Sequence, residues 1–468
     1  MNQDMPAILG GNPVRSQPFV VAPLIDINEE NAVLEAVRGG HFSRYIGSDS
    51  PDIETILRMP SKDAAEIKGV NWHYLGGPNV RQFAADFAAK FGVKYAIPVN
   101  SCTSGLSTAL AAAGVSAGDE VIVPGMSFSA TGTAVLVFNS IPVFVDVDPK
   151  TFCLDPEQVK KSITAKTKAI LPVHLLGNAC AMDQLMNLAA QYNLKVIEDC
   201  AQAIGTKYKG RFVGTIGDAG VFSFQQSKNI MTGEGGMIIT NDAEIARRCR
   251  LIGNHGEVVM KDSHSVAELQ NIIGFNFRMP ELCAAVGVAQ LKKMDTVNRW
   301  RNDNADYLIK NIGDIPGFSR PVVSPDVEMV YHLLAFLFDK EIVGMSRDLF
   351  LTALKHEGIQ AGTGYVRSMY ENPMFLKKTA YGVHGSPWTD GHHPDQISYR
   401  KDQCPVISSL LYEKFLWFYQ ISYPSTREDM QDIVTAVKKI IAWKDDIVNQ
   451  FESGTAMKKE SVRSQGRI

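Results

Sequence analysis

A single lysine lies in the stretch SFQQSKNIMTGEGG, residues 223–236, between the apolar runs AGVFSF and MIIT. Lys228 has no arginine or histidine beside it, and its loop is rich in Gly, Ser and Gln. Such a lysine can be a solvated residue on a hairpin, or its amine can bond covalently to a carbonyl cofactor. The rest of the chain must decide between these two interpretations.

A second stretch, NSCTSG at residues 100–105, joins the strand-like YAIPV to the helix-like LSTALAAA. Small residues at a helix start let backbone N–H groups and hydroxyls surround an anion, and a phosphate fits that arrangement. Because Ser and Thr cap most helices, an ordinary helix cap explains this stretch equally well when it is taken alone.

Two carboxylates, Glu198 and Asp199, follow the apolar residues KVI. Ligands of parallel sheets bind beyond the carboxyl ends of the strands. A carboxylate there can bind magnesium, pair with an arginine, keep the ring nitrogen of a pyridine cofactor protonated, or simply be solvated. Asp199 is the better functional candidate, because it lies one step farther along the strand and next to small residues.

An aromatic residue, Phe128, follows another strand end in PGMSFSAT. Such a residue usually belongs to the core, unless a flat ligand is already implied. Together the four stretches supply a phosphate cradle, an aromatic face, an acid and a lysine, with Lys228 29 positions after Asp199. This combination predicts a site for pyridoxal 5′-phosphate, in which Lys228 bonds to the cofactor and Asp199 keeps its ring charged and electron-withdrawing.

The elements that must position these residues alternate along the chain. Short β-rich runs are interleaved with helical patterns from residue 80 to about residue 280, which predicts an α/β fold with a mainly parallel sheet covered on both faces. Runs such as AILPV are apolar throughout, as expected for strands buried on both sides.

The pattern changes after residue 280, where a long helical stretch leads into shorter elements. We therefore predict four parts: an N-terminal leader and insertion (1–79) with a helix in NEENAVLEAVRGG, a large cofactor-binding domain (80–290), a smaller C-terminal α+β domain (291–450) and a disordered tail (451–468).

Composition excludes several classes of protein. The chain has 468 residues and a net charge of −3, so it lacks the dense positive charge that nucleic acid requires. The seven scattered cysteines never form C-x-x-C, which argues against a disulfide framework or a zinc site and favours a reducing cytoplasm. No apolar run approaches the roughly 20 residues that span a bilayer, and no signal peptide is evident.

These motifs resemble the DegT/StrS-type sugar aminotransferases, which are fold-type I enzymes dependent on pyridoxal phosphate. The resemblance runs from about residue 76 to 257, continues through GFNFRMPELCAAVGVAQL at 274–291, and weakens toward the C-terminus. It rests on NSCTSGL, VIEDCAQAIGTKYKGRFVGTIGDAGVFSF and SKNIMTGEGGMIITND. It implies a large domain with a seven-stranded sheet sandwiched by helices, plus a smaller α+β domain.

The resemblance also assigns a role to each matching residue. Lys228 would form the Schiff base and shuttle protons, and Asp199 would pair with the pyridinium nitrogen. The remaining assignments are Gln202 near the ring's 3-oxygen, Phe128 stacked on the ring, Thr103, Ser104 and Ser223 on the phosphate, and Asn276 on the phosphate of a neighbouring subunit. His174, in PVHLLG, ends a further strand and is expected to line the substrate pocket.

The implied activity is transfer of an amino group from glutamate or glutamine to a keto-sugar or keto-cyclitol, often nucleotide-linked, in antibiotic or surface-polysaccharide biosynthesis. The role of Asn276 implies a homodimer with shared active sites. The opening AILGGNPVR resembles the branch that contains both cyclitol aminotransferases and aminohydroxybenzoate synthases. A synthase that eliminates water and aromatises a ring therefore remains an alternative, as does a cofactor-binding regulatory protein without turnover.

Two segments depart from the family pattern. Residues of about 45–75 and 376–405 are longer than in shorter relatives. We expect both segments to shape the acceptor pocket or to contact another subunit.

Overall fold

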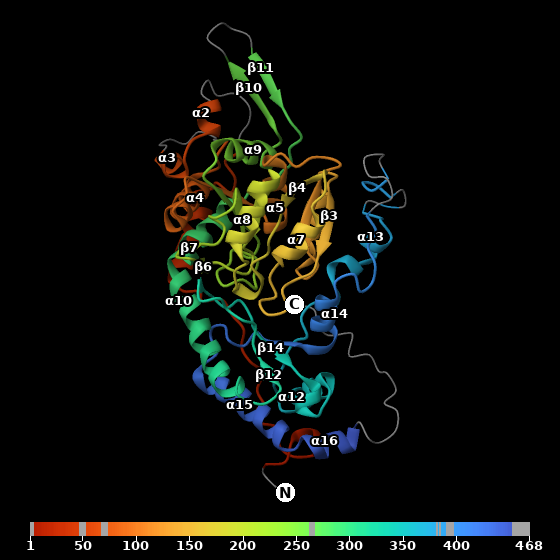
Figure 1. The fold of residues 1–468 in the computed structure, drawn as a ribbon. Coiled ribbons are helices and arrows are strands. Elements are labelled where there is room, and N and C mark those ends of the chain that lie inside the picture. Colours follow the sequence, from red (N-terminus) through yellow and green to blue (C-terminus); the bar gives the residue numbers. More distant parts are fainter. Residues whose placement is uncertain are drawn as a thin grey trace.

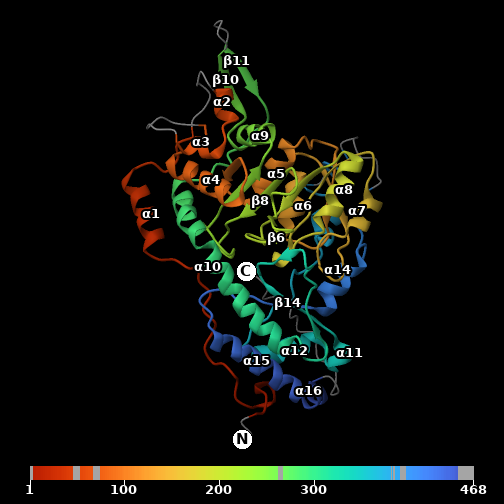
Figure 2. The same cartoon turned by 60° about the vertical axis from the view of Figure 1, so that its left-hand side comes forward.

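The computed structural model describes residues 4–45, 53–66, 74–261, 267–380, 382, 385–389 and 397–451. These residues form a large lobe around one extended β-sheet and a smaller lobe, and the long helix α10 (Glu281–Ile312) runs from one lobe to the other (Figures 1 and 2). Within these ranges, none of the helices has the length and apolar character needed to cross a bilayer.

The large lobe is built on a seven-stranded sheet with the order β1-β9-β8-β5-β4-β2-β3. Strands β8, β5, β4, β2 and β3 run parallel, whereas β9 is antiparallel to both of its neighbours. The predicted α/β fold with a mainly parallel sheet is therefore confirmed. The seven strands are β1 (Tyr95–Val99), β2 (Glu120–Pro124), β3 (Ile141–Val145), β4 (Thr167–Ile170), β5 (Lys195–Asp199), β8 (Ala219–Ser223) and β9 (Gly236–Thr240).

Apolar side chains cover both faces of this sheet. Val121 and Val123 of β2 belong to the core cluster that contains residues of α5 (Cys102–Ala112), whereas Ile122 packs with residues of α8 (Met182–Tyr192). Successive residues of a strand point to opposite faces, so burial of both faces requires an unbroken apolar run.

The other helices of the large lobe connect or cover the strands: α4 (Pro78–Phe91), α6 (Ser129–Leu136), α7 (Pro156–Ser162) and α9 (Ala243–Gly253). Side chains of Ser101, Asp155 and Asp242 accept hydrogen bonds from the first N–H groups of α5, α7 and α9, which fixes where these helices begin. The remaining strands of the lobe are a hairpin, β10 (Glu257–Lys261) and β11 (Ala267–Asn271), which projects from one end (Figure 1), and the short pair β6 (Lys207–Tyr208) and β7 (Arg211–Phe212).

The small lobe is an α+β unit, as the sequence predicts. Its antiparallel sheet has the order β12-β14-β15 and packs against α12 (Arg347–His356) and α15 (Arg427–Ala442) in one apolar cluster. The strands are β12 (Phe318–Ser319), β14 (Leu334–Phe338) and β15 (Phe415–Phe418), and β13 (Val327–Glu328) pairs instead with β6. The shorter helices α11 (Lys340–Val343) and α16 (Lys444–Phe451) complete it, whereas Phe375 of α13 (Pro373–Leu376) and Ile407 of α14 (Pro405–Ser409) pack in the core of the large lobe.

Helix α10 belongs to both lobes. Leu291 and Met294 pack in the cluster of α4, whereas Ala305 and Leu308 pack in the core of the small lobe. The domain boundary predicted at residue 290 therefore falls inside one continuous helix.

The N-terminal residues are integrated into the fold. The predicted amphipathic helix is present as α1 (Ile27–Arg38), where Glu29 accepts from Gln290 Nε2 at 2.8 Å and pairs with Lys293 at 2.5 Å, both on α10. Upstream, Arg15 forms ion pairs with Asp429 and Asp432 of α15 at 2.7 and 2.9 Å. The segment thus binds the helix shared by the two lobes and then the small lobe.

The two longer segments each bind an edge of the central sheet. Ser61, which begins α3 (Ser61–Ala65) after α2 (Ile53–Leu57), accepts from the Ala96 N–H at 2.8 Å and donates to the Ala96 carbonyl at 3.1 Å, on edge strand β1. On the opposite edge strand, β3, Tyr399 donates to the Pro142 carbonyl at 2.8 Å. The described parts of the two segments thus bind backbone groups of the edge strands, a role that the sequence did not predict. Residues 46–52, 67–73, 390–396 and the predicted tail from 452 lie outside the described residues.

Candidate active site

The four sequence stretches converge at one edge of the central sheet. β5 ends at Asp199, β8 ends at Ser223 before the loop that carries Lys228, and β1 runs directly into the start of α5. Because these strands are parallel to one another, their carboxyl ends lie along the same edge. The loop after β2, which contains Phe128, begins at that edge as well.

Asp199 is a buried acid held by two hydrogen bonds. Only 3% of its surface is exposed, Thr131 Oγ1 donates to Oδ2 at 2.8 Å, and the Ala201 N–H donates to Oδ1 at 3.1 Å. Burial raises the pKa of Asp199, although these hydrogen bonds and the nearby charge of Lys228 oppose the shift. Each oxygen keeps acceptor capacity, so the carboxyl can receive a further donor such as a ring N–H.

Lys228 lies half-buried in the segment between β8 and β9, where its backbone N–H donates to the Gln225 carbonyl at 2.9 Å. Burial lowers the pKa of Lys228; the charge of Asp199 acts against the shift, and the charge of Arg301 adds to it. The amine is therefore biased toward its neutral, nucleophilic form.

The start of α5 offers backbone and hydroxyl donors. The first N–H groups of a helix have no partner within the helix. Ser104 is 7% exposed and its hydroxyl bonds to Asn100 Oδ1 at 2.6 Å, while Thr103 is half-buried. A Cβ on Gly236 would lie 2.6 Å from the Ser101 carbonyl carbon, so glycine is required where β9 passes under this cradle.

Two further predicted cofactor residues lie at or after strand ends on the same edge of the sheet. Ser223, at the end of β8, is 7% exposed and accepts from the Gln225 N–H at 3.4 Å. Phe128 is 62% exposed, so its ring is available to a flat ligand, as the prediction requires.

Asn276 is exposed on the segment beside the cradle. Its carbonyl accepts from Asn100 Nδ2 at 3.4 Å and its Oδ1 accepts from Arg278 Nε at 2.8 Å. Its predicted reach into a neighbouring subunit stays a prediction.

Gln202 connects the two lobes at the site. Its Oε1 accepts from the Leu176 N–H at 2.8 Å and its Nε2 donates to the hydroxyl of Tyr365 at 2.9 Å. Burial raises the pKa of Tyr365 to about 12, with the Gln202 hydrogen bond opposing and Asp199 adding to the shift, so the phenol stays protonated. Tyr365 and Thr131 are site residues that the sequence analysis missed.

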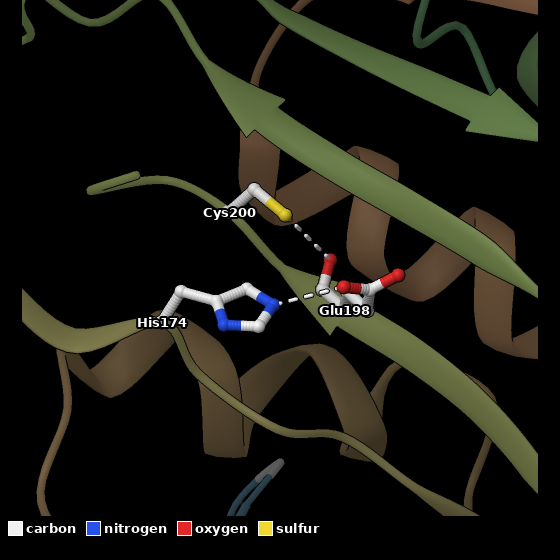
Figure 3. Close-up of side chains that lie close together, drawn as sticks. All are labelled: His174, Glu198 and Cys200. Atoms are coloured by element: carbon white, nitrogen blue, oxygen red, sulfur yellow. Dashed lines mark hydrogen bonds and ion pairs between the residues drawn. The ribbon is translucent and has the colours of Figure 1, made fainter. Parts of the chain in front are cut away.

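The structure places His174 differently from the prediction. His174 is 0% exposed, its Nδ1 accepts from the Cys180 N–H at 3.2 Å, and its Nε2 donates to Glu198 Oε2 at 2.9 Å (Figure 3). A side chain with no exposed surface cannot line a substrate pocket. The prediction was wrong because a strand end in a parallel sheet can face the packed interior as well as the ligand edge.

His174, Glu198 and Cys200 place three potential metal-ligand atoms within 4.8 Å of one another (Figure 3). The carboxylate of Glu198 is already occupied, because it accepts from His174 and from three backbone N–H groups, those of Gly214, Ile216 and Gly217, at 2.7–2.8 Å. Burial raises the pKa of the Cys200 thiol, so its thiolate is disfavoured. The cluster is a hydrogen-bonded support beneath β5 and does not fit a metal.

Comparisons with known proteins agree with this geometry. A model of the DegT/DnrJ/EryC1/StrS aminotransferase family matches residues 58–400. The chain belongs to this family. The resemblance drawn from the motifs is therefore confirmed, and the protein is an aminotransferase of a family that depends on pyridoxal phosphate.

Individual relatives of the family cover most of the chain. L-glutamine:2-deoxy-scyllo-inosose aminotransferase of Streptomyces lividus is 33% identical, over 93% of this chain and 97% of its own. GDP-perosamine synthase of Escherichia coli O157:H7 is 40% identical over 60% of this chain and 76% of its own. The solved aminotransferase from Psychrobacter cryohalolentis is 31% identical, with a TM-score of 0.74 over 91% of this chain and 99% of its own.

The donor set of the site fits the cofactor of the family. Helix-start N–H groups and hydroxyls suit a phosphate, the buried Asp199 suits a pyridine nitrogen, and Lys228 suits a carbonyl carbon. Tyr365 could not be found from sequence, because it lies 163 positions from its partner Gln202. Thr131 lies in the same PGMSFSAT stretch as Phe128, so the sequence could have indicated it as a site residue.

Proposed function

We propose that this protein transfers an amino group from glutamine to the ring ketone of a cyclitol or sugar, using pyridoxal 5′-phosphate bound at Lys228. One observation carries the proposal: an amine with a lowered pKa, Lys228, lies at the same sheet edge as the buried acid Asp199. The name of the Streptomyces lividus relative, which this chain covers almost end to end, supports glutamine as donor and a keto-cyclitol as acceptor.

When bound, the cofactor supplies an electron sink for the carbon that loses a proton. Lys228 would bond to it and, once displaced by the amino donor, would accept and return that proton. It can do so only when its amine is neutral, which burial favours. Asp199 would stay close to the ring nitrogen and hold its proton, because Thr131 and the Ala201 N–H fix the carboxyl in place.

The other residues would bind and orient. Thr103, Ser104 and Ser223 would donate to the phosphate beside the first N–H groups of α5, and Phe128 would cover one face of the ring. Gln202 would lie near the ring's 3-oxygen, with Tyr365 holding its amide from the small lobe. Asn276 would complete the phosphate site of a second copy, so the active unit would be a homodimer.

The proposed compartment is the cytoplasm. All seven cysteines are free, and all but Cys283 are buried. Free thiols persist in a reducing environment.

The test begins with the cofactor bond. Purified protein is treated with borohydride, digested and analysed by mass spectrometry, and the expected result is a pyridoxyl group on Lys228. The Lys228→Ala protein should fold, carry no such label and show no turnover. A wild-type protein without the label would overturn the proposal.

The second arm tests donor and acceptor. Glutamine and glutamate are each supplied with a keto-inositol or a nucleotide-linked 4-keto-sugar, and the aminated product is measured by mass spectrometry. Product from glutamine and the keto-inositol supports the proposal in full. A labelled protein that converts neither ketone, and instead releases an aromatic acid from an amino-cyclohexenone substrate, would identify the synthase alternative.

A further inference from the structure

Arg301 is a buried cation that forms no ion pair with any residue that the structure describes. Its side chain lies on α10 with 7% of its surface exposed, Nη1 donates to the His332 carbonyl at 2.7 Å, and Nε has no hydrogen-bond partner. Among the described residues, no carboxylate lies within ion-pair distance of the guanidinium, and burial lowers the pKa of Arg301 to about 10. An uncompensated buried charge costs stability, so charges of this kind mark functional positions.

Hydrogen bonds connect Arg301 to the lysine loop. His332, whose carbonyl binds Arg301, lies with its Nδ1 3.3 Å from the Oδ1 of Asn229, the residue that follows Lys228. Asn229 also donates through Nδ2 to Asn298 Oδ1 at 3.0 Å, and Asn298 lies one turn before Arg301 on α10. The backbone that carries Lys228 is thereby held against the helix that carries Arg301.

Four titratable groups interact with the Lys228 amine: Arg301 on α10, His332 in the segment before β14, Cys102 on α5 and Asp199 on β5. Burial lowers the pKa of His332 well below its ordinary value, and burial raises the pKa of the Cys102 thiol, so both are neutral. Asp199, when ionised, stabilises the ammonium form of Lys228. Of these four groups Arg301 is the positively charged one, and its effect on the pKa of Lys228 is opposite to that of Asp199.

We propose that Arg301 is a positioning residue that adds to the effect of burial and disfavours the charged form of the Lys228 amine, by placing a fixed positive charge behind the lysine loop. The proposal rests on the proposed function, since an uncharged amine is what bonding to the cofactor and proton transfer require. The second effect is mechanical, because Arg301 also anchors the His332 carbonyl and through Asn229 the loop itself. Both the electrostatic and the mechanical effect arise from residues of this chain.

The test measures the ionisation of Lys228 directly. Full-length protein freed of cofactor is exposed to trace acetic anhydride from about pH 6 to about pH 11, and acetylation of Lys228 is quantified by mass spectrometry. In Arg301→Gln, which keeps an N–H donor for the His332 carbonyl but removes the charge, the labelling midpoint should rise by about one pH unit. Acetylation near neutral pH should accordingly fall about tenfold.

Two controls separate charge from structure. Arg301→Lys keeps the charge and should keep the wild-type midpoint. Arg347→Gln removes another buried arginine, which donates to the Leu411 and Phe415 carbonyls. This variant should leave the labelling midpoint of Lys228 unchanged, while it lowers the denaturation midpoint of the protein about as much as Arg301→Gln does.

An unchanged Lys228 midpoint in folded Arg301→Gln would overturn the inference, as would an equal rise in Arg347→Gln. If Arg301→Gln does not fold, Arg301→Met removes the same charge and gives the same test. The readout is independent of the proposed function. A wild-type protein that carries the pyridoxyl label but shows no effect of Arg301 refutes only the inference, whereas absence of the label refutes the proposed function.

Discussion

Neighbouring residues of β5 show how one strand end serves two purposes. Glu198 and Asp199 point to opposite faces of the sheet, and their pKa values shift in opposite directions. Burial alone would raise the pKa of both carboxyl groups. In Glu198 the hydrogen bonds from His174 and the backbone N–H groups outweigh burial, so the pKa of Glu198 is lowered. Glu198 is therefore an ionised anchor within the fold, and Asp199 an acid directed at the site.

Substitution of Asp199 should impair chemistry with little effect on folding. Asp199→Asn keeps the size and one acceptor of the side chain but removes the charge that holds a ring proton, so the rate of the glutamine half-reaction should fall by about 10²- to 10³-fold. Single-turnover absorbance of the bound cofactor measures this rate. Thr131→Val, which removes only the 2.8 Å donor to Asp199, should cost less. A near-normal rate in Asp199→Asn would remove the residue from the mechanism.

Substitution of Glu198 should impair folding. Glu198→Gln turns one of the two acceptor oxygens into a donor, opposite either the Gly214 N–H or the N–H groups of Ile216 and Gly217, which should destabilise the protein by about 3 kcal/mol at pH 7. Because the folded pKa is lowered, the stability from Glu198 is present above its unfolded value near 4.3 and is lost as pH falls through the folded value. Urea midpoints should therefore differ most at neutral pH and converge below about pH 4, and a pH-independent difference would contradict this assignment.

At the scale of elements, the longer segments act on the edges of the sheet. Tyr399 donates to the Pro142 carbonyl of β3 and accepts from Trp388 Nε1 at 3.0 Å, all within a buried aromatic cluster. Ser61 satisfies both backbone groups of Ala96 on the opposite edge strand. A single hydroxyl on each side thus satisfies backbone groups at one position of each edge strand.

Removal of the Tyr399 hydroxyl should weaken the fold and leave catalysis intact. Tyr399→Phe leaves the Pro142 carbonyl and the Trp388 N–H without their partner, which should cost about 2 kcal/mol in the urea unfolding of the protein. The exposed Tyr192 provides a control, because Tyr192→Phe should leave the urea midpoint unchanged. A fall in kcat with no fall in stability would instead indicate that this segment shapes the acceptor pocket.

The sequence was sufficient for elements whose pattern is local. Unbroken apolar runs such as AILPV identified buried strands, and the small polar residues after YAIPV identified the start of α5. Contacts between distant segments left no such pattern. Tyr365 reaches Gln202, and Ser61 reaches Ala96, only because tertiary packing brings them together. His174 shows the remaining limit, because a strand end in sequence does not reveal which side of the sheet a residue faces.

At the scale of the whole molecule, the N-terminal segment fastens to the small lobe. Glu357 is 0% exposed and accepts from the N–H groups of Ala7 and Val14 at 2.8 and 2.9 Å, while Lys439 of α15 balances its charge at 3.0 Å. Together with the Arg15 ion pairs, these bonds tie the first residues of the chain to its last helices.

Loss of the Glu357 charge should release the N-terminal segment. In Glu357→Gln, one acceptor oxygen becomes a donor and Lys439 loses its partner, so cleavage by trypsin after Arg15 should become about tenfold faster. Mass spectrometry of a digestion time course measures that rate. Glu35→Gln, on the exposed side of α1, should leave it unchanged, and equal rates in both variants would contradict the proposed tether.

The closed sheet edges limit how copies of this protein can associate. A chain with an open edge strand can recruit a foreign strand and grow into fibrous aggregates. Here the backbone groups of Ala96 and the Pro142 carbonyl are already bound by Ser61 and Tyr399, which opposes addition of a strand at these positions on both flanks of the sheet. At these two positions a further copy of the chain cannot add a strand, so contacts between copies there are expected to use side-chain surfaces.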